Sequence, residues 1–171
     1  MNDELRMELE AMHEADQSIR KEAITAVREH GMESAEYVAL RDRGREMDAR
    51  HRARLVEIVE VHGWPTVPMV GTDASHGAFL VLQHAELKMQ KRFLPLLREA
   101  TERGESPTAV LPLLEDRILM REGMPQIYGT QVVPGDDGKA TLWEIEDEEH
   151  VAERRETVGL EPLDEYLARF E

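Results

Sequence analysis

Two long runs of regularly spaced apolar residues at the start of the chain limit the folds that it can adopt. In residues 3–30, apolar side chains recur at steps of three, four or their sums, as one face of an α-helix requires; they are Leu5, Leu9, Met12, Ile19 and Val27. A second predicted helix covers residues 34–62, and Gly31 and Gly63 stand where the two helices would end. Two long helices joined by so short a connection pack as an antiparallel hairpin. We therefore expect a helical bundle built on this hairpin.

The next part of the chain is expected to hold a loop and two more helices. Two prolines and two glycines interrupt residues 63–71, which predicts an ordered loop or a lid. A strong apolar stripe then predicts one helix over Ser75–Arg98, which Pro95 kinks or ends. A Ser-Pro dipeptide opens a further helix over residues 106–122, with serine as the cap and proline in the first position.

Residues 126–145 change character and predict a β-hairpin. Apolar residues lie on both sides of the turn sequence Pro-Gly-Asp-Asp-Gly at residues 134–138. Because a two-stranded ribbon is marginally stable alone, we expect it to pack against helices. Helical patterns return at residues 147–158 and 163–170. The prediction is a mainly α fold, in which residues 1–171 form a single-domain helical bundle with one β-hairpin at about 126–145 packed against it.

Composition and charge exclude several classes of function. The formal net charge of −15 argues against sequence-independent binding to nucleic acid, which requires a basic surface. The 171 residues include no cysteine, which excludes disulfide scaffolds, thiolate zinc sites and a cysteine nucleophile. The longest strongly apolar stretch, Ala78–Leu82, is far shorter than the roughly 20 residues of a membrane helix. The first residues are charged and helix-favouring, unlike a signal peptide. We expect a cytoplasmic protein that binds neither nucleic acid nor membranes.

Arginines crowd the second predicted helix despite the acidic total. They are Arg41, Arg43, Arg45, Arg50, Arg52 and Arg54. The pattern is typical of a solvated face with many salt bridges. A local anion-binding patch is the alternative interpretation.

Three polar side chains interrupt the apolar stripes and mark a candidate site. His84 stands between Leu80 and Leu87, and Asp16 and His51 fall on the stripes of the first two helices. Buried ionisable groups are costly unless they are paired, liganded or used. Each residue alone is also compatible with a structural role, such as a hydrogen-bonded core histidine or a surface ion pair. Together they predict an acid–base site, with His84 as the general acid or base and Asp16 or His51 supporting it.

A second polar cluster lies in residues 125–131, where two amides, a phenol and a hydroxyl surround a glycine. Alternation along a strand would place Gln126 and Tyr128 on one face, where they would hydrogen-bond a ligand. The other interpretation is a strand with ordinary polar decoration. Arg117, next to Asp116, would hold a carboxylate or phosphate of a ligand if it were buried beside this ribbon.

Metal-binding and hydrolase motifs are incomplete or absent in the sequence. Glu10 and His13 form the sole Glu-x-x-His pair, so that the paired pattern of a di-iron bundle is incomplete. The sequence contains no His-Glu-x-x-His and no Gly-x-Ser-x-Gly. An unpatterned cluster of His51, His84 and Asp16 is left as an alternative ligand set. We expect no cofactor.

Six short motifs, taken in order, resemble a known family. The motifs are Asp16-Gln17-x-x-Arg20, Gly63-Trp64-Pro65, Gln83-His84-Ala85-Glu86, Leu114-x-Asp116-Arg117, Pro125-Gln126-x-Tyr128-Gly129-Thr130-Gln131 and Arg155-x-x-x-Gly159-Leu160-x-Pro162-Leu163. Together they span nearly the whole chain, which resembles the bacterial domain-of-unknown-function family 6624. Glu86 departs from the family motif, which usually has aspartate there, and the exchange keeps the charge. The resemblance implies no activity, cofactor or substrate, but it implies positions of interest, which are Asp16, Gln17, Arg20, Trp64, His84, Gln90, Asp116, Arg117, Gln126, Tyr128, Gln131 and Arg155.

The leading hypothesis is a small enzyme of hydrolase or lyase type that acts on a small polar molecule or peptide. Its predicted catalytic residues are His84, Asp16 and His51. Its predicted substrate-binding residues are Gln17, Arg20, Trp64, Gln90, Asp116, Arg117, Gln126, Tyr128, Gln131 and Arg155. One alternative is a non-catalytic acidic binding or immunity-type module with a protein partner, which the net charge favours. The other alternative is a metal-dependent helical oxygenase.

Overall fold

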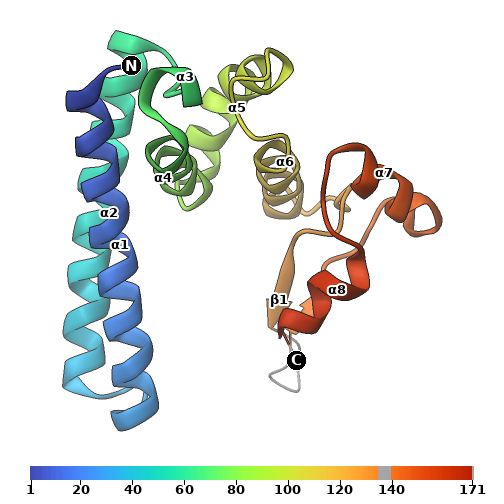
Figure 1. Cartoon of the computed structure of the whole chain (residues 1–171). Helices are drawn as coiled ribbons and strands as arrows, with labels where there is room; N and C mark the ends of the chain where they lie inside the picture. The colour runs from blue at the N-terminus through green and yellow to red at the C-terminus, as the bar shows by residue number, and fades with distance from the viewer. Residues whose placement is uncertain (135–139, 171) are drawn as a thin grey trace. The chain divides into compact units, whose positions relative to one another are not determined.

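The computed structural model describes residues 1–134 and 140–170 and confirms a mainly α fold with one β-hairpin (Figure 1). Contacts within the chain divide it into two compact units, Met1–Ala85 and Glu86–Glu171, named the N-terminal unit and the C-terminal unit below. That the two units together form a single domain stays a prediction.

A long antiparallel hairpin of two helices dominates the N-terminal unit, as the apolar periodicity predicts. Helix α1 spans Asp3–His30 and α2 spans Ala35–His62. Ser34 caps α2 by accepting a hydrogen bond from a backbone N–H with its side chain. Gly31 and Gly63 follow the two helices with φ of +83° and +78°, a left-handed conformation that favours glycine. Both predicted helix ends are therefore confirmed.

Two shorter helices pack against the half of the hairpin that carries the N-terminus. The segment expected to be a loop or lid contains a short helix, α3 (Val67–Val70), and α4 (Thr72–Gln83) follows it. At Gly77 an added Cβ would lie 3.1 Å from the Cβ of His13 and 3.2 Å from the carbonyl oxygen of Leu9. This glycine therefore allows α4 to approach α1 closely.

The single helix predicted over Ser75–Arg98 is wrong, because the chain turns at His84. Helix α4 ends at Gln83, His84 is its C-cap, and α5 begins at Leu87. The side chain of His84 is exposed and not on a buried stripe. Apolar residues have the same helical spacing on both sides of the turn, so the sequence periodicity does not reveal that the helix is interrupted.

Helices α5 (Leu87–Glu102) and α6 (Val110–Arg121) pack together in the C-terminal unit. Helix α5 continues through Pro95, so of the two predicted effects of this proline, a kink or a helix end, the helix end is wrong. Helix α6 begins at Val110, three residues after the predicted first helical position, Pro107. Apolar side chains from both helices are buried, among them Phe93, Leu97, Leu114 and Ile118.

The predicted β-hairpin is confirmed as a short antiparallel pair. Strands β1 (Val132–Pro134) and β2 (Ala140–Leu142) pair with Val132 opposite Leu142. Most of the predicted turn sequence, residues 135–138, lies outside the described residues. An isolated bridge between Gln126 and Ile145 continues the contact beyond the strands.

Short helical segments complete the C-terminal unit. They are η1 (Glu148–His150), α7 (Val151–Thr157), α8 (Leu163–Leu167) and η2 (Ala168–Phe170). They confirm the helical pattern predicted for the end of the chain. Among the residues that the structure describes, none of the helices has the length and apolar character that crossing a membrane requires.

Candidate functional site

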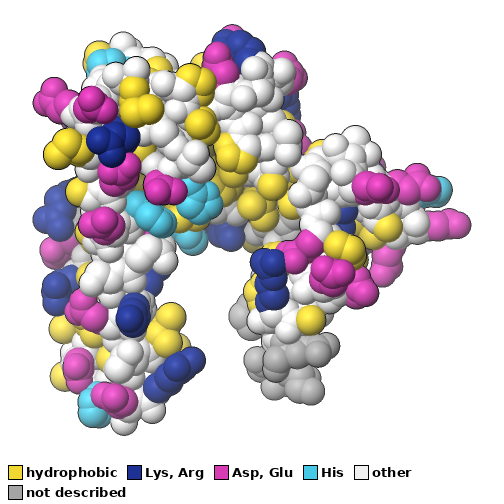
Figure 2. Space-filling model, viewed as in Figure 1, with side chains coloured by type: hydrophobic (Ala, Val, Ile, Leu, Met, Phe, Trp, Pro, Cys, Tyr) yellow, Lys and Arg dark blue, Asp and Glu magenta, His cyan; other side chains and the backbone are white. Residues whose placement is uncertain are grey.

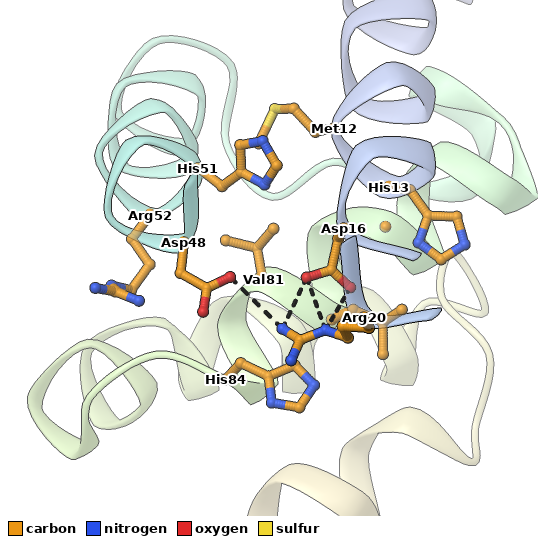
Figure 3. Close-up of a pocket in the computed structure, with 11 residues that line it drawn as sticks. Met12, His13, Asp16, Arg20, Asp48, His51, Arg52, Val81 and His84 are labelled. Atoms are coloured by element: carbon orange, nitrogen blue, oxygen red, sulfur yellow. Dashed lines mark hydrogen bonds and ion pairs between the residues drawn. The ribbon is translucent and has the colours of Figure 1, made fainter. Parts of the chain in front are cut away.

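The three residues predicted to be catalytic line one pocket of the N-terminal unit. Asp16 comes from α1, His51 from α2, and His84 from the end of α4 (Figure 3). The pocket is a narrow hollow whose walls also include Met12, His13, Arg20, Asp48, Arg52, Gly77, Leu80 and Val81. Its volume of about 10 Å³ leaves room for about one water molecule. The pocket would therefore admit the reacting group of a ligand and not a bulky molecule.

An ion-pair network crosses the pocket from α1 to α2. The Arg20 guanidinium donates to both carboxylate oxygens of Asp16, with Nε–O distances of 2.9 and 2.8 Å and an Nη2–Oδ1 distance of 2.7 Å. Its Nη2 also lies 3.5 Å from a carboxylate oxygen of Asp48. The side chain of Asp16 is only 13% exposed. The network therefore holds Arg20 in place at the pocket wall.

One edge of this guanidinium has no partner among the described residues. Nη1 of Arg20 has no hydrogen-bond partner within the described parts of the chain. It points toward the side of the pocket where His84 lies (Figure 3). An arginine that is positioned by carboxylates and has a free N–H edge can donate hydrogen bonds to an anionic group of a ligand.

The histidines around the pocket differ in their environments. Burial lowers the pKa of His51 below its usual value, although the carboxylates of Asp16 and Asp48 act in the opposite direction. His51 is therefore suited to be neutral near pH 7 and to accept a proton. The structure places Asp16 in direct hydrogen bonds with Arg20 and Gln17, so its carboxylate acts on His51 through space.

A second pair of histidines adjoins the pocket where α1 packs against α4. The rings of His13 and His76 meet edge to face with centroids 5.9 Å apart. Nδ1 of His13 is buried and has no hydrogen-bond partner in residues 1–134 or 140–170. Burial and the neighbouring His13 lower the pKa of His76. Figure 2 shows histidine side chains gathered at the surface of this unit.

The described residues contain no group of three or more His, Asp or Glu side chains that is arranged to hold a metal ion. The ligand set considered from the sequence, His51, His84 and Asp16, is thus not arranged as a metal centre. The geometry of the pocket lends no support to the oxygenase alternative.

Asp116, predicted to bind substrate, organises a loop of the C-terminal unit. Its carboxylate is fully buried and accepts hydrogen bonds from the backbone N–H groups of Ile127 (2.8 Å), Tyr128 (3.1 Å) and Thr130 (3.0 Å). It also accepts one from the hydroxyl of Thr130 at 2.9 Å. The carboxylate thereby ties residues 127–130 to α6.

Two buried glutamines also stabilise this loop through hydrogen bonds of their side-chain amides. Gln126 donates to the carbonyl oxygens of Gln131 and Trp143, and its own side-chain oxygen accepts a bond from the backbone of Gln131. Gln131 donates to the hydroxyl of Thr130. These bonds satisfy amide groups that the sequence suggested for ligand binding.

Arg155 closes the same loop from α7. It is 1% exposed and donates to the carbonyl oxygens of Tyr128 (2.7 Å), Gly129 (3.3 Å) and Glu161 (2.7 Å). Its guanidinium also stacks over the ring of Tyr166. The polar groups of Asp116, Gln126, Gln131 and Arg155 therefore serve the fold of the loop.

The remaining residues predicted to bind substrate have varied surroundings. Gln17 is exposed and donates to Asp16, Trp64 is buried, and Gln90 is buried and accepts from Arg121. Burial raises the pKa of the Tyr128 phenol. Nε of Arg117 is buried, and no partner for it lies in the part of the chain that the structure describes.

The motifs that build the pocket and the loop are those that resemble a family of proteins, and a family model matches residues 3–171. The chain belongs to DUF6624, a family of unknown function. No significant match was found among curated proteins or among solved structures. Membership of DUF6624 confirms the resemblance seen in the sequence and assigns no activity.

The one-turn spacing of Asp48 and His51 predicts that Asp48, like Asp16, orients a histidine, and both residues line the pocket of this DUF6624 chain. Sequence reasoning did not place His13 there, although it precedes Asp16 by one helical turn. Residues three apart on a helix lie on the same face, so this spacing was the available signal. No sequence signal indicates that Arg52 also lines the pocket.

Proposed function

We propose that the pocket is an acid–base active site for a small polar substrate with an anionic group. The observation that carries this proposal is the convergence of Asp16, His51 and His84 on one pocket that also contains Arg20. Three separate segments supply these groups, so their meeting requires the tertiary fold. Such a set of titratable groups around a hollow is typical of catalytic sites.

The residues have distinct roles in this proposal. Arg20, held by Asp16 and Asp48, binds the anionic group with its free Nη1 edge. His51 is the proton acceptor, because its lowered pKa keeps it neutral near pH 7. His84 is the complementary proton donor, because it lies at the mouth of the pocket in an exposed position.

In both hydrolysis and elimination, one histidine would accept a proton and the other would donate one. In hydrolysis, His51 takes a proton from the attacking water, and His84 gives a proton to the leaving group. In elimination, His51 takes a proton from carbon, and His84 again protonates the leaving group. Neither route requires a cofactor. The narrow pocket supports a substrate whose reacting group alone enters, such as a small acid or the end of a peptide.

The proposal is tested by a search for turnover followed by matched histidine variants. Small carboxylates, phosphate esters and short peptides are screened for thermal stabilisation of the full chain, and NMR follows the loss of those that stabilise it. We expect His84→Gln and His51→Gln to lower kcat by about 10²- to 10⁴-fold. His62→Gln is the control, because His62 is exposed at the end of α2 and does not line the pocket. Unchanged turnover by folded His84→Gln would contradict the role of His84.

A second candidate function is a non-catalytic module that binds a basic protein. The net charge of −15 favours this alternative. In that case binding would weaken with added salt, and the histidine variants would bind as the parent chain does. A cytoplasmic location and a bacterial source stay predictions from the sequence.

A further inference from the structure

The half of the α1–α2 hairpin that contains Gly31 has an unusual surface. Residues 1–85 are all described, and α3 and α4 pack only near the other end of this hairpin (Figure 1). The two helices bury a small apolar cluster between them, formed by Ile19, Ala26, Leu40 and Met47. One side of this cluster opens into a groove. Two helices alone leave much apolar surface in water, so a third element packed there would add stability.

The groove has an apolar floor and a basic rim. Its floor consists of Ile19, Ala23, Val27, Tyr37 and Leu40. Its rim carries Arg20, Arg28, Arg41 and Arg45. Asp16 and Asp48 pair with Arg20, and Asp42 pairs with Arg41 and Arg45, so the rim has four cations and three carboxylates. Ile24 also lines it and is 54% exposed. Figure 2 shows hydrophobic and basic side chains next to each other on this half of the hairpin.

The hollow on the opposite side of the hairpin has equal numbers of basic and acidic lining residues. The hollow there is lined by two cations, Lys21 and Arg43, and by two carboxylates, Glu22 and Glu36. The excess of arginine on one side is notable in a chain with a net charge of −15. The one-cation excess at the groove favours an acidic ligand over a basic one.

Gly44 also lines the groove, where its missing side chain leaves the backbone of α2 accessible. It lies in the interior of α2, where glycine costs about 1 kcal/mol relative to alanine. An added Cβ would meet only Ile19 Cδ1, at an ordinary 4.0 Å. Packing within the chain therefore does not require glycine here, whereas a backbone docked in the groove would benefit from the missing side chain.

We propose that the arginine-rimmed groove binds an acidic amphipathic helix of a partner protein. Apolar side chains of that helix would fill the floor, and its carboxylates would pair with the rim. Tyr37 and Asp48 are eleven residues apart on α2, or about 16 Å, which matches roughly three turns of a docked helix. A second copy of this groove would place arginines against arginines. Charge therefore favours an acidic partner over self-association.

The test uses a synthetic helical peptide with leucines at helical spacing and flanking glutamates as a probe of the full chain. A lysine-flanked peptide and a scrambled peptide of the same composition are the peptide controls. Fluorescence anisotropy should show that the glutamate peptide binds at least about tenfold more tightly than either control, and that salt weakens it. Equal binding of the lysine peptide, or no binding of the glutamate peptide, would overturn the proposal.

Matched variants locate the peptide on the chain. Gly44→Met fills the groove without changing charge and should weaken binding about tenfold or more. Ala39→Met is the control, because Ala39 is exposed and lines the opposite hollow. Circular dichroism checks that both variants fold. Unchanged affinity in Gly44→Met would overturn the assignment. A dimer of the parent chain in analytical sedimentation that is abolished by Gly44→Met would also overturn the proposal, because the groove would then bind a second copy of the chain.

Discussion

Replacing Asp116 by asparagine is expected to destabilise the C-terminal unit strongly. The carboxylate is fully buried, and its two oxygens accept hydrogen bonds from three backbone N–H groups and one hydroxyl. All these groups donate hydrogen bonds to the carboxylate, so both oxygen positions of the side chain at residue 116 must be acceptors. Asparagine has nearly the same shape but offers one oxygen and one NH2 group.

The magnitude follows from the hydrogen bonds that the NH2 group cannot accept. If it replaces Oδ1, the bond from the N–H group of Ile127 is lost, and Tyr128 keeps only its 3.2 Å bond to Oδ2. A hydrogen bond to a charged group contributes about 1.5–3 kcal/mol, so this orientation costs at least that amount. The opposite orientation loses both bonds from Thr130 and costs at least as much.

The assay must report on the unit that contains Asp116. Trp64 belongs to the N-terminal unit and Trp143 to the C-terminal unit. In a Trp64→Phe background, Trp143 fluorescence during urea unfolding therefore gives the free energy of unfolding around the hairpin. Glu115→Gln is the matched control, because it removes a carboxylate paired with exposed Arg98 and should cost less than about 1 kcal/mol. The reasoning is refuted if Asp116→Asn costs no more than this control.

Two further predictions concern the N-terminal unit. NMR titration should give His51 a pKa below 6.5, and Asp48→Asn should lower the pKa further, because that carboxylate favours the charged imidazole. Burial lowers the pKa of His51 in the folded state, so the contribution of neutral His51 to the free energy of unfolding should be complete above pH 6.5. This contribution should be lost as the pH falls through the folded-state pKa of His51. An unchanged free energy of unfolding in that range would contradict the argument from burial. Gly44→Ala should raise the free energy of unfolding by about 0.5–1 kcal/mol in urea denaturation, and a destabilised variant would show that packing within the chain does require glycine there.

Local signals in the sequence were sufficient for most of the secondary structure. Gly31 and Gly63 mark the ends of α1 and α2, because both need a left-handed backbone that other residues adopt poorly. The turn at His84 had no such signal, because no glycine or proline marks it and apolar spacing continues on both sides. Pro95 does not end its helix, since α5 continues through it, so a proline inside an apolar stripe is an ambiguous signal.

The candidate site was predictable in its membership and not in its geometry. Helical periodicity singled out Asp16, His51 and His84, and the structure places all three at one pocket. The reason given for His84 was nevertheless wrong, because its side chain is exposed at a helix end. The carboxylate of Asp16 pairs with Arg20. Whether these residues act in catalysis stays a prediction.

The sequence by itself determined the helical hairpin, the β-hairpin and the family, because periodicity, turn residues and short motifs are local properties of the chain. Only the tertiary structure decided which polar groups bind one another. Asp116, Gln126 and Arg155 are predicted to bind substrate, and in the structure they form hydrogen bonds to backbone groups as far as 27 residues away. Such partners depend on how distant segments pack, and a buried polar group is satisfied by whichever partner the packing brings to it.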